Sequence, residues 1–327
     1  MSSKRKKYFI GCLGVGVLIW MMFCSLYQDF SFWERISASG LNNIKNKKEK
    51  IDFQVETKEE LQQFVSSLSG KGICVVDMTQ NRILAEKRAD KRIAPASTTK
   101  LLTALTVLEV CKVTEVVTAG DELGLVAADA SRAGIEFGDS LTVKQLLEGM
   151  LLPSGNDAAY ALAVYAGRKI SGQESDVNTA LSCFLKEMNE TGKKLGARHS
   201  HFVHPDGYDG ENQYTTARDL ACISVAFMKS SKENGLLREI VKKPKIRECF
   251  LNGRDVTWRN TNLMLNGESA YYDPEIIGLK TGSSEEAGKC LISAVSRKNT
   301  IYLVVMMGCE EEERYENSRA IYQMLEK

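Results

Sequence analysis

The sequence contains little proline and histidine, and it has no surplus of charge of either sign. Its 327 residues include 5 prolines, 3 histidines, and 43 lysines and arginines against 42 aspartates and glutamates. So little proline, together with 43% hydrophobic residues, excludes a proline-rich disordered chain and indicates a globular protein. The balanced charge argues against a nucleic-acid partner, because sequence-independent phosphate binding requires a basic surplus.

The sequence also lacks the cysteine patterns of redox and zinc proteins. None of its nine cysteines forms a Cys-x-x-Cys pair, which argues against thioredoxin-like and zinc-ribbon proteins. Cys12 and Cys24 fall in an apolar N-terminal run, and the remaining seven cannot all pair with one another within the chain. We therefore expect mostly free, buried thiols.

One long run without charged side chains lies near the N-terminus, at residues 8–27. As a helix these 20 residues would be about 30 Å long, which matches the hydrocarbon core of a bilayer. Four of the first seven residues are basic, so the positive-inside rule predicts a cytoplasmic tail at 1–7, a transmembrane anchor at 8–27 and an extracytoplasmic chain from Gln28 onward. The alternative is a signal peptide, with a secreted product if residues 1–39 are cleaved.

The rest of the chain predicts a stalk followed by one α+β domain. Residues 28–55 are rich in asparagine and lysine without a clear period, which predicts a solvated stalk, and the domain follows at 56–327. Helical spacing dominates roughly residues 111–250, and strand patterns lie on both sides of it. This order predicts one sheet built from both ends of the chain, with a mostly helical subdomain inserted.

Local patterns predict the positions of individual helices and strands. A capping box at Thr57-Lys-Glu-Glu60 predicts one helix start. The other predicted helices span residues 96–110, 143–150, 158–166, 179–195, 217–228 and 315–326, and the clearest predicted strands span 73–78, 82–86, 288–295 and 301–307.

Ser97 and Lys100 form the first string that indicates chemistry. They lie three residues apart at the start of a strongly periodic helix, so their side chains share one face of its first turn. A serine hydroxyl becomes a nucleophile when a base takes its proton, and a neutral lysine amine is one such base. Lowering a lysine pKa from about 10.4 to about 7 requires roughly 4 to 5 kcal/mol, which burial and a second nearby cation can supply.

Two further strings follow in a set order. Ser154-Gly-Asn156 lies in the helical block, and Lys280-Thr281-Gly282 lies at the start of the late strands. Ser-x-x-Lys alone occurs often by chance. In the order Ser-x-x-Lys, Ser-x-Asn, Lys-Thr-Gly, however, the three strings are the catalytic motifs of the serine penicillin-recognising enzymes.

Over about residues 57–327 the chain resembles the low-molecular-mass penicillin-binding proteins that act as D-alanyl-D-alanine carboxypeptidases. The resemblance implies the β-lactamase/transpeptidase-like α+β fold, with an antiparallel sheet flanked by helices, a role in peptidoglycan biosynthesis and cell shape, and no metal or organic cofactor. Beyond the three motifs it rests on Ala89-Asp90, Gly138-Asp139, Glu187-Met-Asn, Pro205-Asp206-Gly207 and Asn260-Thr-Asn262.

The resemblance also implies catalytic roles. Ser97 would attack the carbonyl between the two terminal D-alanines of a peptidoglycan stem peptide, and Lys100 would take the hydroxyl proton. Ser154 would pass a proton to the leaving D-alanine, and Asn156 would hold the substrate amide and Lys100. β-Lactams would acylate the same serine, because they imitate the terminal dipeptide.

Substrate binding is implied for four consecutive residues, Lys280, Thr281, Gly282 and Ser283. Lys280 and Thr281 would bind the terminal carboxylate of the substrate, and the backbone N–H groups of Ser97 and Ser283 would form the oxyanion hole. The chain departs from the family at His204 and Tyr208, where asparagine and leucine are usual. These residues flank the Pro205-Asp206-Gly207 turn, which borders the site in the family, so the substrate preference that this loop confers stays open. Carboxypeptidase and endopeptidase activity also remain alternatives.

Three competing functions stay open. A class A-like β-lactamase would use Glu174-Ser-Asp-Val177-Asn178 to activate a water molecule, although this string departs from the usual Glu-x-x-Leu-Asn. A zinc peptidase would use His199, His201 and His204, but no activating carboxylate is evident beside them. A noncatalytic penicillin-binding wall sensor would not need the serine and lysine pair.

Overall fold

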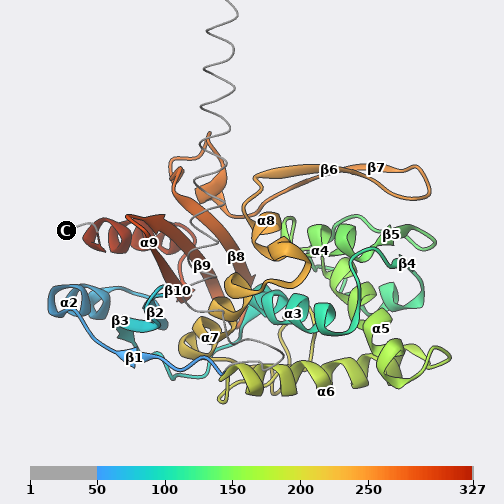
Figure 1. Cartoon of the computed structure of the whole chain (residues 1–327), viewed down its shortest axis with the longest axis horizontal. Helices are drawn as coiled ribbons and strands as arrows, with labels where there is room; N and C mark the ends of the chain where they lie inside the picture. The colour runs from blue at the N-terminus through green and yellow to red at the C-terminus, as the bar shows by residue number, and fades with distance from the viewer. Residues whose placement is uncertain (1–49, 326–327) are drawn as a thin grey trace, which may run out of the picture. The chain divides into compact units, whose positions relative to one another are not determined.

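Both ends of the described chain contribute strands to one six-stranded sheet (Figure 1). The computed structural model describes residues 50–325, and the strand order is β1-β3-β2-β10-β9-β8. Val305 of β10 lies opposite Cys74 of β2, so the central pairing joins the two ends. The prediction of one sheet built from both ends of the chain is therefore confirmed. Its strands are β1 (Gln54–Val55), β2 (Gly72–Asp77), β3 (Arg82–Lys87), β8 (Ile276–Ser284), β9 (Gly288–Arg297) and β10 (Thr300–Cys309).

The expectation of an antiparallel sheet is wrong at one edge of the sheet. β1 pairs in parallel with β3, with Gln54 opposite Arg82, so the sheet is mixed. Helix α2 (Glu59–Ser67) and strand β2 separate β1 from β3 along the chain. β1 is therefore free of the hairpin geometry that makes consecutive strands antiparallel.

The start of the described chain lies against the domain. Ile51 N donates to Leu195 O at 3.1 Å, and β1 occupies residues that the sequence analysis assigned to the stalk. The domain therefore begins a few residues before the expected boundary at residue 56. The predicted capping box at Thr57 is wrong, because the N-cap of α2 is Lys58 and no side chain caps it.

The expected cytoplasmic tail, the segment at 8–27 and most of the stalk lie outside the described residues. Within residues 50–325, no helix is long and apolar enough to cross a membrane. The cysteines of this part of the chain are free, and five of the seven are buried, as expected from the sequence.

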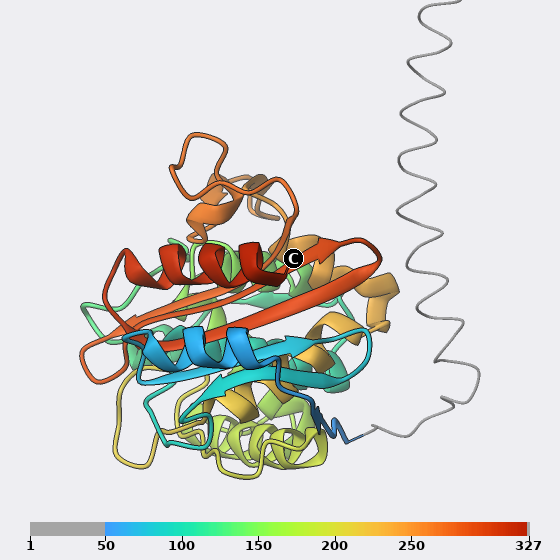
Figure 2. The same ribbon diagram turned by 90° about the vertical axis from the view of Figure 1, so that its left-hand side faces the viewer.

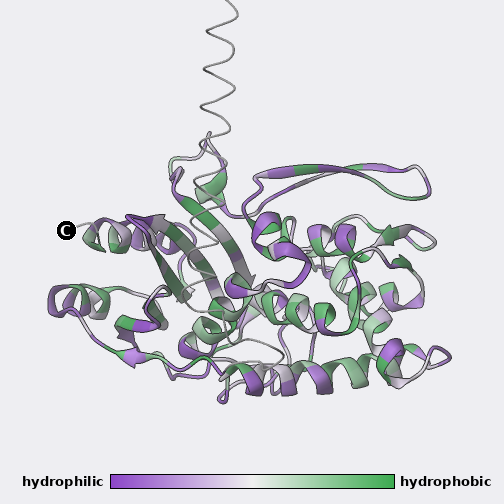
Figure 3. Cartoon of the chain, viewed as in Figure 1, coloured by the Kyte–Doolittle hydropathy of each residue, from purple (hydrophilic) through white to green (hydrophobic). Residues whose placement is uncertain are grey.

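Helices cover both faces of the sheet. α2 and α9 (Glu313–Leu325) lie side by side on one face, which is turned toward the viewer in Figure 2. Leu61 and Tyr322 are among the side chains that fill the core beneath them. Helix α7 (Ala217–Lys229) packs on β2 and β10 from the other face. Hydrophobic residues concentrate along the strands (Figure 3), because these strands are covered on both sides.

The helical subdomain surrounds one buried helix, α3 (Lys100–Val110). Each residue from Lys100 to Leu108 is buried, as expected for a helix in the middle of a core. The predicted helix at 96–110 starts as a 3-10 turn, η1 (Ala96–Thr99), so Ser97 and Lys100 lie on either side of the change in helix type. The remaining helices are α4 (Val143–Leu151), α5 (Asn156–Ser171), α6 (Val177–Leu195) and α8 (Leu236–Val241).

Short strands and 3-10 turns complete the fold. Two small hairpins lie outside the main sheet: β4 (Val116–Thr118) with β5 (Ser140–Thr142), and β6 (Lys245–Cys249) with β7 (Asp255–Arg259). The remaining 3-10 turns are η2 (Asp121–Leu125), η3 (Lys232–Gly235) and η4 (Leu263–Leu265).

Close packing of α5 on α6 generates a stability prediction. A methyl group at Gly167 of α5 would overlap the backbone carbonyl of Ala180 in α6. We expect Gly167→Ala to lower the free energy of unfolding by about 1 to 3 kcal/mol, the usual cost of overpacking. Gly124→Ala is the matched control, because nothing lies within 4 Å of its added methyl group. Urea denaturation of both variants measures the difference, and equal stabilities would contradict the packing argument.

Candidate active site

Lys100 lies at the centre of the candidate site. Its Nζ is 2.8 Å from Ser97 Oγ, 2.7 Å from Asn156 Oδ1 and 2.7 Å from the backbone carbonyl oxygen of Asp206. The spacing of three residues across the turn from η1 to α3 creates the first contact. The other two come from chain segments that tertiary packing brings together.

Burial controls the charge of this lysine. Lys100 has no solvent exposure, and burial lowers its pKa to about 8, although the carboxylates of Asp206 and Asp157 act in the opposite direction. A lysine with this pKa is neutral in about one molecule in ten at pH 7, far more often than a lysine in water. Neutral Lys100 can accept the proton of Ser97, which makes the serine a nucleophile.

Asn156 reaches Lys100 from the first residue of α5. Asn156 N donates to Ser131 O at 2.8 Å, which fixes the start of this helix. Ser154 precedes it with a positive φ of 66°, and its side chain is buried. Gly155 fits between them because a Cβ there would lie 2.7 Å from the carbonyl oxygen of Gly149. In the described part of the chain, the Ser154 hydroxyl forms no hydrogen bond, and Ser154 is not among the residues that line the pocket at Ser97.

Asp157 fixes the start of α5, and no motif in the sequence predicted this role. Its carboxylate accepts backbone N–H groups from Ala133 at 2.8 Å, Gly134 at 2.9 Å and Ile135 at 3.0 Å. These bonds tie the start of α5 to the loop that lies against it. The only sequence signal was an aspartate directly after Asn156 at a predicted helix start, where acidic residues are common.

Strand β8 brings the third string to the nucleophile. A Cβ on Gly282 would lie 3.2 Å from side-chain atoms of Ala96 and of Thr98, so β8 packs closely on η1. Thr281 Oγ1 is 2.5 Å from Thr261 Oγ1, which belongs to the Asn-Thr-Asn string of the sequence. The two hydroxyls therefore orient one another.

Lys280 is the second buried lysine. It is 1% exposed, and its Nζ donates to the carbonyl oxygen of Thr281 at 3.1 Å. Burial lowers its pKa well below 10.5, and the positive charges of Lys100 and Arg314 lower it further. A bound anion would stabilise the protonated form of Lys280, so Lys280 and Arg314 favour binding of a carboxylate. Arg314, which donates to Gly282 O at 3.3 Å, is a further residue that the sequence analysis did not identify.

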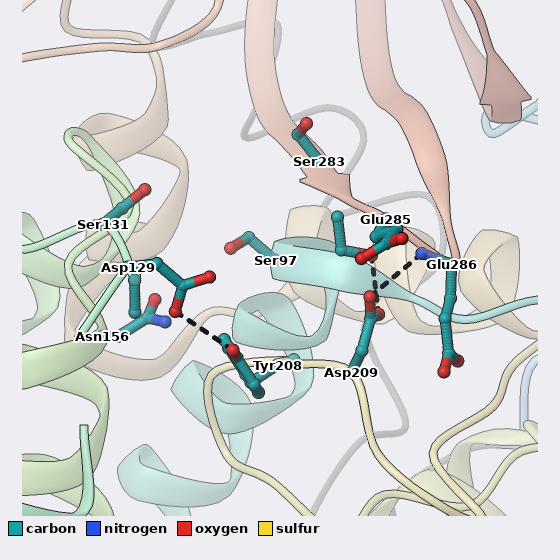
Figure 4. Close-up of a pocket in the computed structure, with 12 residues that line it drawn as sticks. Ser97, Asp129, Ser131, Asn156, Tyr208, Asp209, Ser283, Glu285 and Glu286 are labelled. Carbon is teal, nitrogen blue, oxygen red and sulfur yellow. Dashed lines mark hydrogen bonds between the residues drawn. The ribbon is translucent and has the colours of Figure 1, made fainter. Parts of the chain in front are cut away.

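A pocket of about 550 Å³ opens at Ser97 (Figure 4). Ser97, Asn156 and Ser283 line it together, although they come from η1, α5 and β8. The charged residues among its described lining are all acidic. They are Asp129, Asp209, Glu285 and Glu286.

The residues that the β-lactamase and zinc-peptidase alternatives would use do not line this pocket. Glu174 is exposed in the turn before α6, whose N-cap is Asp176, and it does not line the pocket. His201 Nδ1 lies 2.8 Å from Asn212 O, whereas His204 Nδ1 lies 3.3 Å from the hydroxyl of Tyr160. Among residues 50–325, no three potential ligands form a group that could hold a metal ion.

Comparisons with known proteins agree with this geometry. A family model described as D-alanyl-D-alanine carboxypeptidase matches residues 56–311. A D-alanyl-D-alanine carboxypeptidase of Streptomyces sp. strain K15 is 37% identical over 226 residues, which cover 65% of this chain and 72% of that protein. DacF of Bacillus subtilis, also named a D-alanyl-D-alanine carboxypeptidase, is 28% identical over 245 residues, which cover 73% of this chain but only 57% of DacF.

Solved structures show the same likeness. The crystal structure of the Streptomyces K15 DD-transpeptidase superposes with a TM-score of 0.70 at 31% identity. The match covers 79% of this chain and 97% of that one. A penicillin-binding protein homologue from Mycobacterium tuberculosis superposes with a TM-score of 0.66 at 26% identity.

The lowered pKa of Lys100 predicts a pH dependence. Lys100 accepts a proton only when neutral, so the rate of Ser97 acylation should rise about tenfold per pH unit below about 8 and level off above it. The rate constant for labelling by a fluorescent penicillin, measured between pH 5.5 and 9.5, tests this. Lys100→Arg keeps a permanent charge and should lower the plateau at least about 100-fold. A profile without a rise through pH 8 would contradict a base role for Lys100.

Proposed function

The chain belongs to the D-alanyl-D-alanine carboxypeptidase family, and we propose that it removes the terminal D-alanine from peptidoglycan stem pentapeptides through an acyl-enzyme on Ser97. The observation that carries this proposal is the contact of Ser97 with a buried Lys100 at the edge of a pocket. A protein that only binds its ligand has no need of a nucleophile paired with a base of lowered pKa.

In the proposed acylation step, Lys100 takes the proton of Ser97 as Oγ attacks the carbonyl carbon of the penultimate D-alanine. An ester bond forms between Ser97 and this carbon, and the C–N bond to the terminal D-alanine breaks. Ser154 donates a proton to the leaving amine and is reprotonated from Lys100. Water then hydrolyses the ester, which regenerates Ser97.

Substrate binding would use the groups on β8 and α5. The terminal carboxylate would lie near Lys280 and Thr281, where its negative charge would stabilise the protonated form of Lys280. Asn156 would hold both Lys100 and a backbone amide of the substrate. The backbone N–H groups of Ser97 and Ser283 would stabilise the oxyanion, and removal of one such donor in a comparable enzyme costs about 100 to 1000-fold in rate.

β-Lactams should acylate the same serine. Their strained amide resembles the scissile bond, and their carboxylate can occupy the site of the terminal carboxylate. The expected product is a stable covalent adduct on Ser97. A β-lactamase would release the opened drug rapidly, and Glu174, the residue that would activate water in that alternative, is exposed and does not line the pocket.

The proposal extends to the cellular location. Residues 8–27 would anchor the chain in the bacterial cell membrane, and the domain would face the peptidoglycan outside the cytoplasm. The uncharged 20-residue run and the basic residues before it support this topology.

A second candidate reaction is transfer of the acyl group to an amine. The support for it is the name of the Streptomyces K15 structures, which are described as DD-transpeptidase. Both reactions share the acylation step and differ in whether water or an amino group attacks the ester. Incubation with a pentapeptide and glycine as amine acceptor distinguishes them by product mass.

The central prediction concerns Ser97. We expect Ser97→Ala to lower the release of D-alanine from a stem pentapeptide by at least about 1000-fold and to abolish labelling by fluorescent penicillin, because no ester can form. The matched control, Ser67→Ala, removes an exposed hydroxyl of α2 and should keep full activity. Equal D-alanine release by the wild type and Ser97→Ala would rule out this mechanism.

A further inference from the structure

The loop at 205–209 is fixed to the nucleophile helix at its inner end. Thr103 Oγ1 donates to Pro205 O at 2.5 Å, and Lys100 Nζ donates to Asp206 O at 2.7 Å. Gly207 has a φ of 85° and packs so closely on Ala96 that a methyl group would overlap the Ala96 carbonyl. The path of this loop is therefore set by the residues around Ser97 and its base.

The outer end of the same loop holds the turn between β8 and β9. The Asp209 carboxylate accepts the Ser284 hydroxyl at 2.6 Å and the backbone N–H of Glu286 at 3.0 Å (Figure 4). Ser284 Oγ in turn accepts the backbone N–H of Ala287 at 3.1 Å. One carboxylate thus fixes the side chain that closes this turn and a backbone group within it.

The place of β8 in the sheet makes this contact important. β8 is the last strand of the sheet order, so β9 is its one neighbouring strand in the described structure. Ser283 lies directly before Ser284 near the end of β8, pairs with Lys289 and lines the pocket together with Ser97. The Asp209 contacts add to the pairing with β9 an attachment directly at this strand end.

We propose that Asp209 is a positioning residue for acyl transfer, which holds the end of β8 so that Ser283 stays in place relative to Ser97. The proposal rests on the proposed function, since it assigns Ser283 N–H to the oxyanion hole. Asp209 acts through Ser284 and does not itself touch the reacting atoms. A misplacement of about 1 Å in such a constellation can cost about 100-fold in rate.

Asp209 can be tested apart from its neighbours. Tyr208 makes a separate contact, with its hydroxyl donating to Asp129 at 3.0 Å on another wall of the pocket. Glu285 also lines the pocket but is exposed, and no hydrogen bond joins its side chain to Asp209 or Ser284. Glu285→Gln therefore removes one negative charge beside the same turn and leaves both Asp209 contacts intact.

The experiment compares the full-length wild type with Asp209→Ala, Asp209→Asn, Ser284→Ala, the Asp209→Ala/Ser284→Ala double variant and Glu285→Gln. Three quantities are measured: the acylation rate constant with fluorescent penicillin, kcat and KM for D-alanine release, and the thermal midpoint. We expect Asp209→Ala to lower the acylation rate and kcat by about 10 to 100-fold, with KM changed less than about threefold. Asp209→Asn keeps one acceptor oxygen and should lose less.

The double variant and the pH dependence of the acylation rate separate a positioning role of Asp209 from a merely structural one. Ser284→Ala should cost less in the Asp209→Ala background than in the wild type, because both substitutions remove the Asp209–Ser284 contact and only the Ala287 contact of Ser284 remains to be lost. The rise of the rate with pH should keep its midpoint near 8 in Asp209→Ala, because Lys100 keeps its surroundings. A merely structural role would instead lower the thermal midpoint and leave kcat per folded molecule unchanged.

Two results would overturn the inference. The first is an Asp209→Ala acylation rate within threefold of the wild type. The second is an equal loss in Glu285→Gln, which would attribute the effect to pocket charge. If the wild type itself is not acylated at Ser97, the proposed function fails. If it is acylated and the Asp209 variants match it, only the present inference fails.

Discussion

A lysine ammonium withdrawn from water needs acceptors for its hydrogen atoms, and Lys100 is supplied with three. Ser97, Asn156 and the carbonyl oxygen of Asp206 lie 2.7 to 2.8 Å from its Nζ. They belong to η1, to α5 and to the loop before α7, so one buried amine joins three segments that are remote in the sequence. The same burial lowers the pKa of Lys100. The chemistry of the site and the convergence of these segments therefore have one cause.

The segments that meet Lys100 are held by their own polar contacts. Asp157 ties the start of α5 to the preceding loop through backbone N–H groups, and Asp209 ties the loop after Asp206 to the β8–β9 turn. The backbone N–H groups that these two carboxylates accept belong to turns and loops outside the helices and strands, which lack the regular hydrogen bonds of those elements. Side-chain acceptors supply what the backbone of these turns cannot.

The sequence predicted features that depend on local spacing. Ser97 and Lys100 approach one another because a separation of three residues places them on one face of a helical turn. Hydrophobic periodicity also predicted β2, β3, β9 and β10 within two residues at each end. It could not predict the parallel pairing of β1 or the contacts of Asp157 and Asp209. Each of those depends on partners more than 20 residues away, and any surface aspartate has the same local pattern.

The pairing of β2 with β10 means that the six-stranded sheet can form only after β10 has been synthesised. The partners Cys74 and Val305 are separated by most of the described chain, and their strands are at the middle of the sheet. During synthesis from the N-terminus, β2 emerges early and has to wait for β10 before its second edge is covered. β8 joins the sheet only through β9, which is attached to β10. A nascent chain that stops short of β10 therefore carries every residue of the three motifs but lacks the strand that joins β2 to β9.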